Sequence, residues 1–225
     1  MTEQCQIRDN ILQRLRNNRM DHQTATSRVA SDSPDWDKQE KIHHFTQRIA
    51  AVHGEVHLVD KNLWLEAVTQ QLQDKQLKRV LLAENAMGRQ ISEYCQESQI
   101  TWYSDEIENF KDKLFNEIDA SVTGCKAAIA ETGSLVLWPD NIEPRLMSLV
   151  PPVHIVLLDA ENIFSSLADI INQQNWQNKL PSNALLISGP SKTADIEQTL
   201  AYGIHGPKKL VVIILDELRS ADDQL

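Results

Sequence analysis

Apolar residues follow two spacings along the chain, and the two spacings alternate. From Val52 onward, short apolar runs typical of strands are separated by segments whose apolar residues recur every three or four positions, as in helices. This alternation predicts a Rossmann-like α/β fold, a mostly parallel sheet flanked by helices on both faces. The expected strands are 54–59, 79–83, 100–103, 120–123, 135–138, 154–158, 184–187 and 210–215. The expected helices are 63–72, 88–97, 107–115, 163–172 and 194–201.

The first 51 residues have a different pattern. Ile7–Arg19 has four apolar residues at helical spacing among arginines, which predicts a docked amphipathic helix or one that binds a partner or a membrane surface. Residues 21–38 are polar and predict a linker in which Trp36 contacts the rest of the protein. Residues 41–51 predict a second helix. The chain is therefore expected to consist of an N-terminal helical arm and linker, 1–51, and an α/β domain, 52–225.

Charge and cysteine content narrow the classes of function. Lys and Arg number 22 against 32 Asp and Glu, a net charge of −10, which argues against a nucleic-acid-binding protein. The cysteines at 5, 95 and 125 form no CxxC pair, which predicts reduced thiols and too few ligands for a four-cysteine iron–sulfur cluster. The histidine spacings predict no metal site. With no signal-peptide pattern at the start and no apolar run of about 20 residues, we expect a cytoplasmic protein without a membrane span.

The small-residue segment 127–134 is the first candidate site. It enters a predicted strand, and Gly133 permits a turn with positive φ. Glu131 is the single carboxyl group in this stretch, and burial would favour its protonated form. Glu131 is therefore a candidate catalytic residue, as a general base or a covalent nucleophile. The alternative is a structural glutamate that accepts hydrogen bonds from backbone amides.

The segment 188–197 is the second candidate site. It follows a predicted strand and leads into the predicted helix 194–201, where Ser191 or Thr193 would be the N-cap. Backbone amides at such a terminus bind anions, but Asp195 in the first turn weakens the field, so a small carboxylate fits at least as well as a phosphate. The candidate binding residues here are Ser188, Gly189, Ser191, Lys192, Thr193 and Asp195.

Two further residues have chemistry that suits a site. His205 lies between Gly203 and Gly206, just before the last strand, and histidine changes charge near neutral pH. We treat His205 as a candidate catalytic residue and Gly206 as a candidate binding residue, against the alternative of a structural histidine. Arg145 could hold a substrate carboxylate by two hydrogen bonds. Its alternative is a surface ion pair with Glu143.

Four segments together resemble the LUD domain family, in particular its LutC/YkgG type, the lactate utilization protein C group. In order along the chain, they are 128–137, 148–155, 188–197 and 203–207. The helix at 11–16 is similar to the start of that family, so the resemblance covers nearly the whole chain. Glu131-Thr132 stands where many members have Asp-Thr.

The resemblance implies both a fold and a role. The fold would be similar to the NagB/RpiA/CoA-transferase group. The role would be that of a subunit of an L-lactate oxidation system that produces pyruvate, with iron–sulfur clusters in two partner proteins and no cofactor in this chain. A small carboxylate is the expected substrate. Two alternatives stay open: a separate transferase or isomerase, in which Glu131 is a nucleophile or base, and a non-catalytic assembly subunit.

Overall fold

Contacts divide the chain into two units, Met1–Ala30 and Ser31–Leu225. The computed structural model describes residues 33–103, 107–176, 180–194, 200–202 and 206–217, together with Arg8 and residues 12–14. Arg8 and residues 12–14 are helical, and the rest of the helix predicted at 7–19 lies outside the described residues. The division of the chain into 1–51 and 52–225 stays a prediction.

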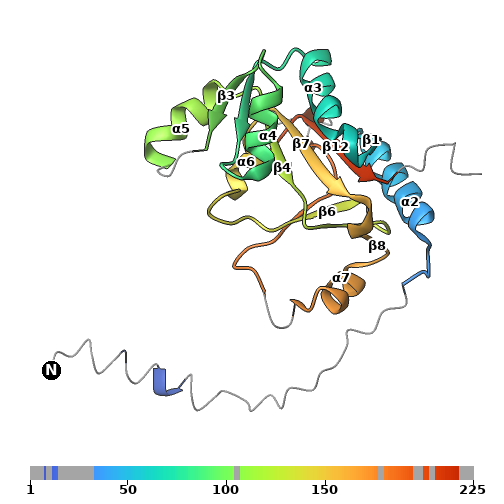
Figure 1. Ribbon diagram of the computed structural model, residues 1–225. Helices are drawn as coiled ribbons and strands as arrows, with labels where there is room; N and C mark the ends of the chain where they lie inside the picture. The colour runs from blue at the N-terminus through green and yellow to red at the C-terminus, as the bar shows by residue number, and fades with distance from the viewer. Residues whose placement is uncertain are drawn as a thin grey trace, which may run out of the picture. The chain divides into compact units, whose positions relative to one another are not determined.

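Six parallel strands form the main sheet of the second unit (Figure 1). Their order across the sheet is β1-β12-β7-β4-β2-β3, and every neighbouring pair is parallel. The α/β class predicted from the sequence is confirmed, and each strand begins and ends within one residue of its predicted limits. The strands are β1 (Glu55–Asp60), β2 (Arg79–Leu82), β3 (Gln99–Trp102), β4 (Ala120–Gly124), β7 (Val153–Asp159) and β12 (Lys209–Asp216).

Helices α3 (Trp64–Asp74) and α4 (Ala86–Tyr94) cover one face of this sheet. Val68 of α3 and Ile91 of α4 are fully buried among alternate strand residues such as Ile155, as the amphipathic pattern predicts. A short 3-10 helix, η1 (Lys61–Leu63), leads into α3. Helix α4 begins two residues earlier than predicted because the Asn85 side chain accepts a hydrogen bond from the Gly88 amide and caps its first turn.

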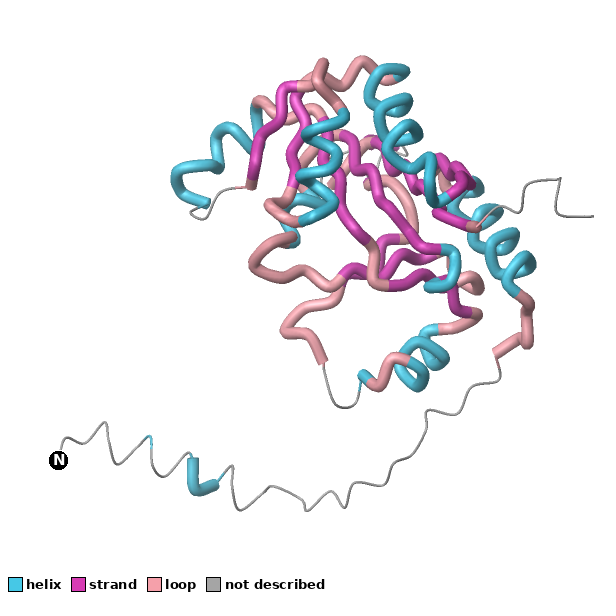
Figure 2. Tube along the Cα trace, in the orientation of Figure 1, coloured by secondary structure: helices cyan, strands magenta, loops and turns pink. Residues whose placement is uncertain are grey.

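The other face is covered by helices α2 (Lys38–Ala51), α5 (Ile107–Asn116) and α6 (Arg145–Leu149) and by a smaller sheet (Figure 2). Phe45 and Ile49 of α2 are fully buried in this layer. Helix α2 begins at Lys38 rather than Lys41 because Asp37 and Glu40 form a capping box.

Trp36 contacts the rest of the protein, as predicted. It packs against the core beneath α2 and stacks on His44 with ring centroids 4.0 Å apart. None of the helices in the described part of the chain is long and apolar enough to cross a membrane.

The smaller sheet has the strand order β8-β5-β6-β9. It consists of β5 (Ala127–Ile129), β6 (Ser134–Leu137), β8 (Ile163–Phe164) and β9 (Leu185–Ile187). The strands predicted at 135–138 and 184–187 therefore exist, but in this second sheet. The helix predicted at 163–172 is partly wrong, because its first two residues pair with β5. A 3-10 helix, η2 (Ala160–Asn162), precedes β8, and the helical part is α7 (Leu167–Gln173), which Ser166 and Asp169 cap.

The helix predicted at 194–201 is wrong. Residues on both sides of its centre form an antiparallel pair, β10 (Lys192–Ala194) with β11 (Leu200–Tyr202). The Gly-Pro turn and the hydroxyl residues that resembled a helix start occur before strands too, and pairing between the two segments decided the outcome. Lys192–Ala194 is therefore a strand where the start of that helix was expected, and the binding roles of Ser191 and Thr193 stay predictions.

The strand order changes direction between β2 and β4. From β2 the chain moves outward to β3, returns to β4 on the other side of β2, and continues through β7 to β12. Ligands of open α/β sheets bind in the crevice beyond the carboxyl ends of two such strands. The residues that follow β2 and β4, namely 83–85 and 125–126, therefore mark where the fold favours a site.

Candidate functional site

A pocket of about 230 Å³ lies beyond the carboxyl end of β4. Its wall comes from three segments: the end of β4 with the two residues after it, the end of β6 with the loop that follows, and the start of α6. The lining residues are Thr123, Gly124, Cys125, Lys126, Leu137, Trp138, Pro139, Glu143, Pro144 and Ser148. The pocket is smaller than the 300–1,000 Å³ typical of drug-sized ligands, so it suits a small molecule.

Glu143 is the acidic residue of this pocket, and its carboxylate connects the ends of β2 and β4. It accepts a hydrogen bond from the Asn85 side-chain amide at 2.7 Å and one from the Gly124 backbone amide at 3.1 Å. Asn85 follows β2 and Gly124 ends β4, so Glu143 lies at the change in strand order. A carboxylate has about four acceptor positions, and these two bonds leave capacity for a ligand.

The surroundings of Glu143 favour its protonated form. Burial raises the pKa of this carboxyl group, the two hydrogen bonds oppose that shift, and the nearby Asp140 charge adds to it. Both hydrogen-bond donors are neutral. Glu143 and Arg145 both lie in the described part of the chain, and no ion pair joins them. The surface pair weighed for Arg145 is therefore not formed.

Polar side chains lie beneath the pocket on the face of the main sheet. Thr123, at the pocket wall, hydrogen-bonds through Oγ1 to Nε2 of the fully buried His154 at 2.8 Å. Burial lowers the pKa of His154 to about 3, so the ring is neutral near pH 7. Ser121 donates to the Met147 carbonyl at 2.5 Å and Ser148 donates to the Arg145 carbonyl at 3.0 Å. The Ser121 bond joins α6 to the sheet beside the pocket, and the Ser148 bond lies within α6.

The rim of the pocket has a positive charge and an aromatic ring. The exposed Lys126 ammonium lies 5.3 Å from the centre of the Trp138 ring, which also packs against Trp176 at 5.0 Å. Lys126 makes no ion pair with the residues that the structure describes. Cys125 next to it is a thiol, because burial raises its pKa to about 12. Cys125 donates hydrogen bonds to carbonyls and is a poor nucleophile.

The Glu131 segment and the Ser188 segment come together elsewhere, at the end of α2. Three hydroxyls form a chain there, with Thr132 Oγ1 and Ser188 Oγ each 2.7 Å from Ser134 Oγ. Gly133 has φ +65, as predicted, and a Cβ atom on it would lie 2.4 Å from Cβ of Arg48.

The backbone of this region requires a second glycine. Gly189 has φ +149, and a Cβ atom on it would lie 2.6 Å from Cγ2 of Val52. Glu131, at the turn between β5 and β6, is exposed. The burial on which its proposed catalytic role depended is therefore absent in this structure.

Ser191 and Gly206 form another contact. The Ser191 amide donates to the Pro207 carbonyl at 2.8 Å, and a Cβ atom on Gly206 would lie 3.1 Å from Cβ of Ser191. Lys192 is exposed in β10, and Arg145 is exposed at the first position of α6. None of the predicted site residues that the structure describes lines the pocket at Glu143.

Asp195 and His205, the remaining two predicted site residues, lie outside the described residues. Their roles stay predictions.

The sequence predicts no binding role for Glu143, which lines the pocket, or for Asn85, which donates a hydrogen bond to it. The sequence predicts Glu143 only as a surface partner of Arg145, and it predicts no role for Asn85. A signal for Asn85 was available, since it follows the buried run 79–83 and precedes a helix. No local signal marks Glu143, because its partners are 58 and 19 residues away in sequence.

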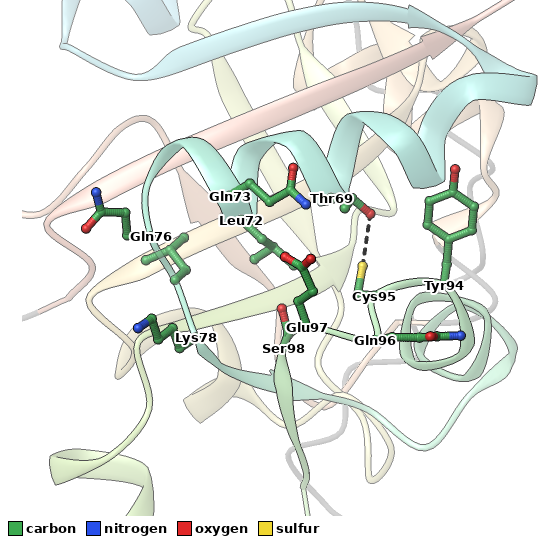
Figure 3. A pocket seen from close by; sticks show the side chains of 11 residues that line it. Thr69, Leu72, Gln73, Gln76, Lys78, Tyr94, Cys95, Gln96, Glu97 and Ser98 are labelled. Carbon is green, nitrogen blue, oxygen red and sulfur yellow. Dashed lines mark hydrogen bonds between the residues drawn. The ribbon is translucent and has the colours of Figure 1, made fainter.

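A larger cavity, about 760 Å³, lies at the opposite end of the strands of the main sheet (Figure 3). It runs between the ends of α3 and α4, and the residues before β2 and β3 line it, so it lies at the amino ends of the strands. Leu72 and Cys95 line it, and the Cys95 thiol is 3.0 Å from Oγ1 of Thr69. Burial raises the pKa of Cys95. The smaller pocket at Glu143 is the better site candidate, because it contains titratable groups and lies where the strand order changes direction.

The histidines that the structure describes form no cluster with other metal ligands. Within the described ranges, no group of three or more His, Cys, Asp or Glu residues could hold a metal ion. His53 has a positive φ of 67, and His43 and His44 contact each other edge to face at 5.8 Å.

An α/β protein with a parallel sheet and a pocket at its change in strand order belongs to the Rossmann-like class of ligand-binding folds. This chain belongs to the LUD domain family, whose model matches residues 42–215.

Individual relatives agree with this assignment. The chain is 37% identical to an uncharacterized protein of Neisseria meningitidis serogroup B over 81% of each chain. It is 26% identical to lactate utilization protein C 1 of Bacillus mycoides, over 83% of this chain and 86% of that protein. A crystal structure of a DUF162 family protein from Deinococcus radiodurans has the same fold, with a TM-score of 0.57 and 19% identity, over 80% of this chain and 99% of that one.

Proposed function

We propose that this protein is a component of a lactate utilization system, in which it acts with two iron–sulfur partner proteins in the oxidation of L-lactate to pyruvate. The observation that carries the proposal is the match to lactate utilization protein C 1 over most of both chains, within a family whose model covers residues 42–215. The pocket at Glu143 supports it, because its size suits a small acid.

The redox centres of this system would lie in the partners. Four thiolate ligands hold a typical iron–sulfur cluster, and this chain has three cysteines. Two of them, Cys95 and Cys125, are held as thiols by burial, which raises their pKa values. We therefore expect the purified chain alone not to oxidise L-lactate with a soluble dye as acceptor.

Affinity purification and growth test this proposal together. A strain without this chain should lose growth on L-lactate and keep growth on pyruvate, which enters metabolism after the proposed step. Purification of the tagged chain from lactate-grown cells should recover two proteins that contain iron and acid-labile sulfide. Unimpaired growth on L-lactate contradicts the proposal, and so does lactate oxidation by the single chain at an enzymatic rate.

A further inference from the structure

We propose that the pocket between Glu143 and Lys126 binds a small 2-hydroxy monocarboxylate, with the ligand carboxylate near Lys126 and its hydroxyl group near Glu143. The class of small monocarboxylate rests on the pocket itself. The choice of a 2-hydroxy acid rests on the proposed function.

The volume of the pocket limits the size of the ligand. One water molecule has a share of about 30 Å³ in the liquid, so about 230 Å³ holds an acid of three or four carbons with one or two waters. A nucleotide or an acyl-CoA is several times larger and could enter only in part. The wall contributed by Leu137, Trp138 and Pro139 provides apolar surface for a short carbon chain.

The two ends of the pocket differ in charge and hydrogen-bonding capacity. Lys126 is exposed and lies over Trp138, and no carboxylate of the described residues neutralises it. An ammonium in this position attracts an anion and offers three donors. Glu143 is held in place by Asn85 and Gly124, so its free acceptor positions have a fixed direction. A ligand that presents a carboxylate to one end and a hydroxyl donor to the other satisfies both.

The protonation state of Glu143 affects which oxygen it prefers. An ionised carboxylate accepts a hydrogen bond from a hydroxyl, and a protonated carboxyl group donates one to a carbonyl. The same side chain can therefore contact a 2-hydroxy acid and the corresponding 2-oxo acid. Neither contact requires a chemical step, and the proposal concerns binding alone.

Binding to the purified full chain tests the proposal, with L-lactate, pyruvate and acetate as probes, measured by titration calorimetry or ligand-observed NMR. We expect saturable binding of L-lactate, weaker binding of acetate, which lacks the hydroxyl, and at least a tenfold loss in Glu143→Gln and in Lys126→Met. The matched controls Glu93→Gln and Lys111→Met change exposed residues on α4 and α5 and should bind as the unmodified chain does.

A second variant guards against loss of folding in Glu143→Gln. A Cβ atom on Gly124 would lie 3.7 Å from Oε2 of Glu143, an ordinary contact, so Gly124→Ala should fold and place a methyl group beside the carboxylate. We expect weaker L-lactate binding in Gly124→Ala at unchanged thermal stability. Full-strength binding in both Gly124→Ala and Lys126→Met would overturn the proposal, as would no saturable binding of any probe.

The outcomes separate this proposal from the proposed function. If the pocket variants bind L-lactate at full strength while deletion of the chain abolishes growth on L-lactate, the pocket proposal fails and the lactate role stands. If acetate binds as tightly as L-lactate, and both are lost in Lys126→Met, the pocket takes monocarboxylates and the 2-hydroxy choice fails. In that case a role in lactate utilization loses the support of this site.

Discussion

Strand β4 has a carboxyl group at each end, and the two are held in opposite ways. Asp119, just before the strand, accepts hydrogen bonds from the Arg79 guanidinium at 2.7 Å and from the backbone amides of Arg79 and Lys78. Glu143, at the other end, accepts hydrogen bonds from neutral donors alone. The Arg79 side chain lowers the pKa of Asp119, whereas burial raises the pKa of Glu143.

Asp119 is a structural carboxylate, whereas Glu143 is suited to binding. Asp119 has its charge matched by a cation, and its hydrogen bonds connect the starts of β2 and β4. Glu143 has a charge that the fold does not match, at the end of the sheet where ligands of such folds bind. Carboxyl groups whose pKa is raised by burial, as that of Glu143 is, occur often at functional sites.

The largest effect should be the difference in stability between Asp119→Asn and Glu143→Gln, which replace each carboxylate with its amide. Asp119→Asn should lower the free energy of unfolding at pH 7 by about 2 kcal/mol, because hydrogen bonds to a charged group are lost. Glu143→Gln should change it by less than about 1 kcal/mol, because the fold gains little from that charge. Urea denaturation of both variants measures the difference, and a larger loss in Glu143→Gln would contradict the comparison.

The pH dependence of stability should have opposite signs at the two sites. The pKa of Asp119 is lowered from 3.8 in the fold, so its contribution is present above the unfolded pKa and is lost as the pH falls through the folded pKa. The pKa of Glu143 is raised from 4.5, so its contribution is present below the unfolded pKa and is lost as the pH rises through the folded pKa.

Unfolding free energies measured between pH 3 and pH 8 test these signs. Asp119→Asn should flatten the loss of stability on the acid side of this range. Glu143→Gln should remove part of the decline with rising pH that begins near pH 4.5. If both variants change the same side of the pH profile, the assignment of opposite pKa shifts is wrong.

A smaller effect, on the pKa of Glu143, should follow from placing a negative charge next to it. Asn85→Asp keeps an oxygen that can cap the Gly88 amide but removes the amide donor to Glu143. The pKa of Glu143 should rise further, because a like charge disfavours the ionised form. Carbon-detected NMR titration of the Glu143 carboxyl group measures this. Asn85→Ser, which keeps a cap without the charge, is the control and should shift the pKa less.

The smallest effect concerns the thiol beside the site. Cys125 should resist iodoacetamide at pH 7 in the folded protein, because burial raises its pKa. The charge of Glu143 adds to that shift, so Glu143→Gln should make Cys125 slightly more reactive. Mass spectrometry of peptides after timed alkylation, in a Cys5→Ser background, measures the rate. A faster reaction in the original chain than in Glu143→Gln would contradict the proximity of the two groups.

Local patterns predicted the main sheet because its four inner strands, β12, β7, β4 and β2, are mostly buried. Burial on both faces of the sheet gives a continuous apolar run, such as 79–83. Burial of one face of a helix gives helical spacing of apolar residues, such as that in 63–72. The helix predicted at 163–172 is wrong in part and the helix predicted at 194–201 is wrong, because short mixed segments take the structure that their partners impose. Ile163 pairs with Ala128, and Lys192 pairs with Tyr202. No spacing within either segment encodes that partner.

The candidate site was harder to predict than the fold for a related reason. Loop composition favours Glu131 and Ser188 as site residues, but both lie near the end of α2, where glycines allow close backbone contact. Glu143 acquires its properties from Asn85 and Gly124, which are distant in sequence. Strand order brings these residues together, and strand order is a property of the whole chain.

The position of β12 has a consequence for the synthesis of the protein. Strand β1 has β12 as its one neighbour in the main sheet, with Glu55 opposite Val211, and β12 also pairs with β7. While a ribosome is still making residues 209–216, β1 has no strand to pair with, and one edge of β7 is open. The emerging chain must therefore keep the edges of β1 and β7 from pairing with other chains until β12 arrives between them.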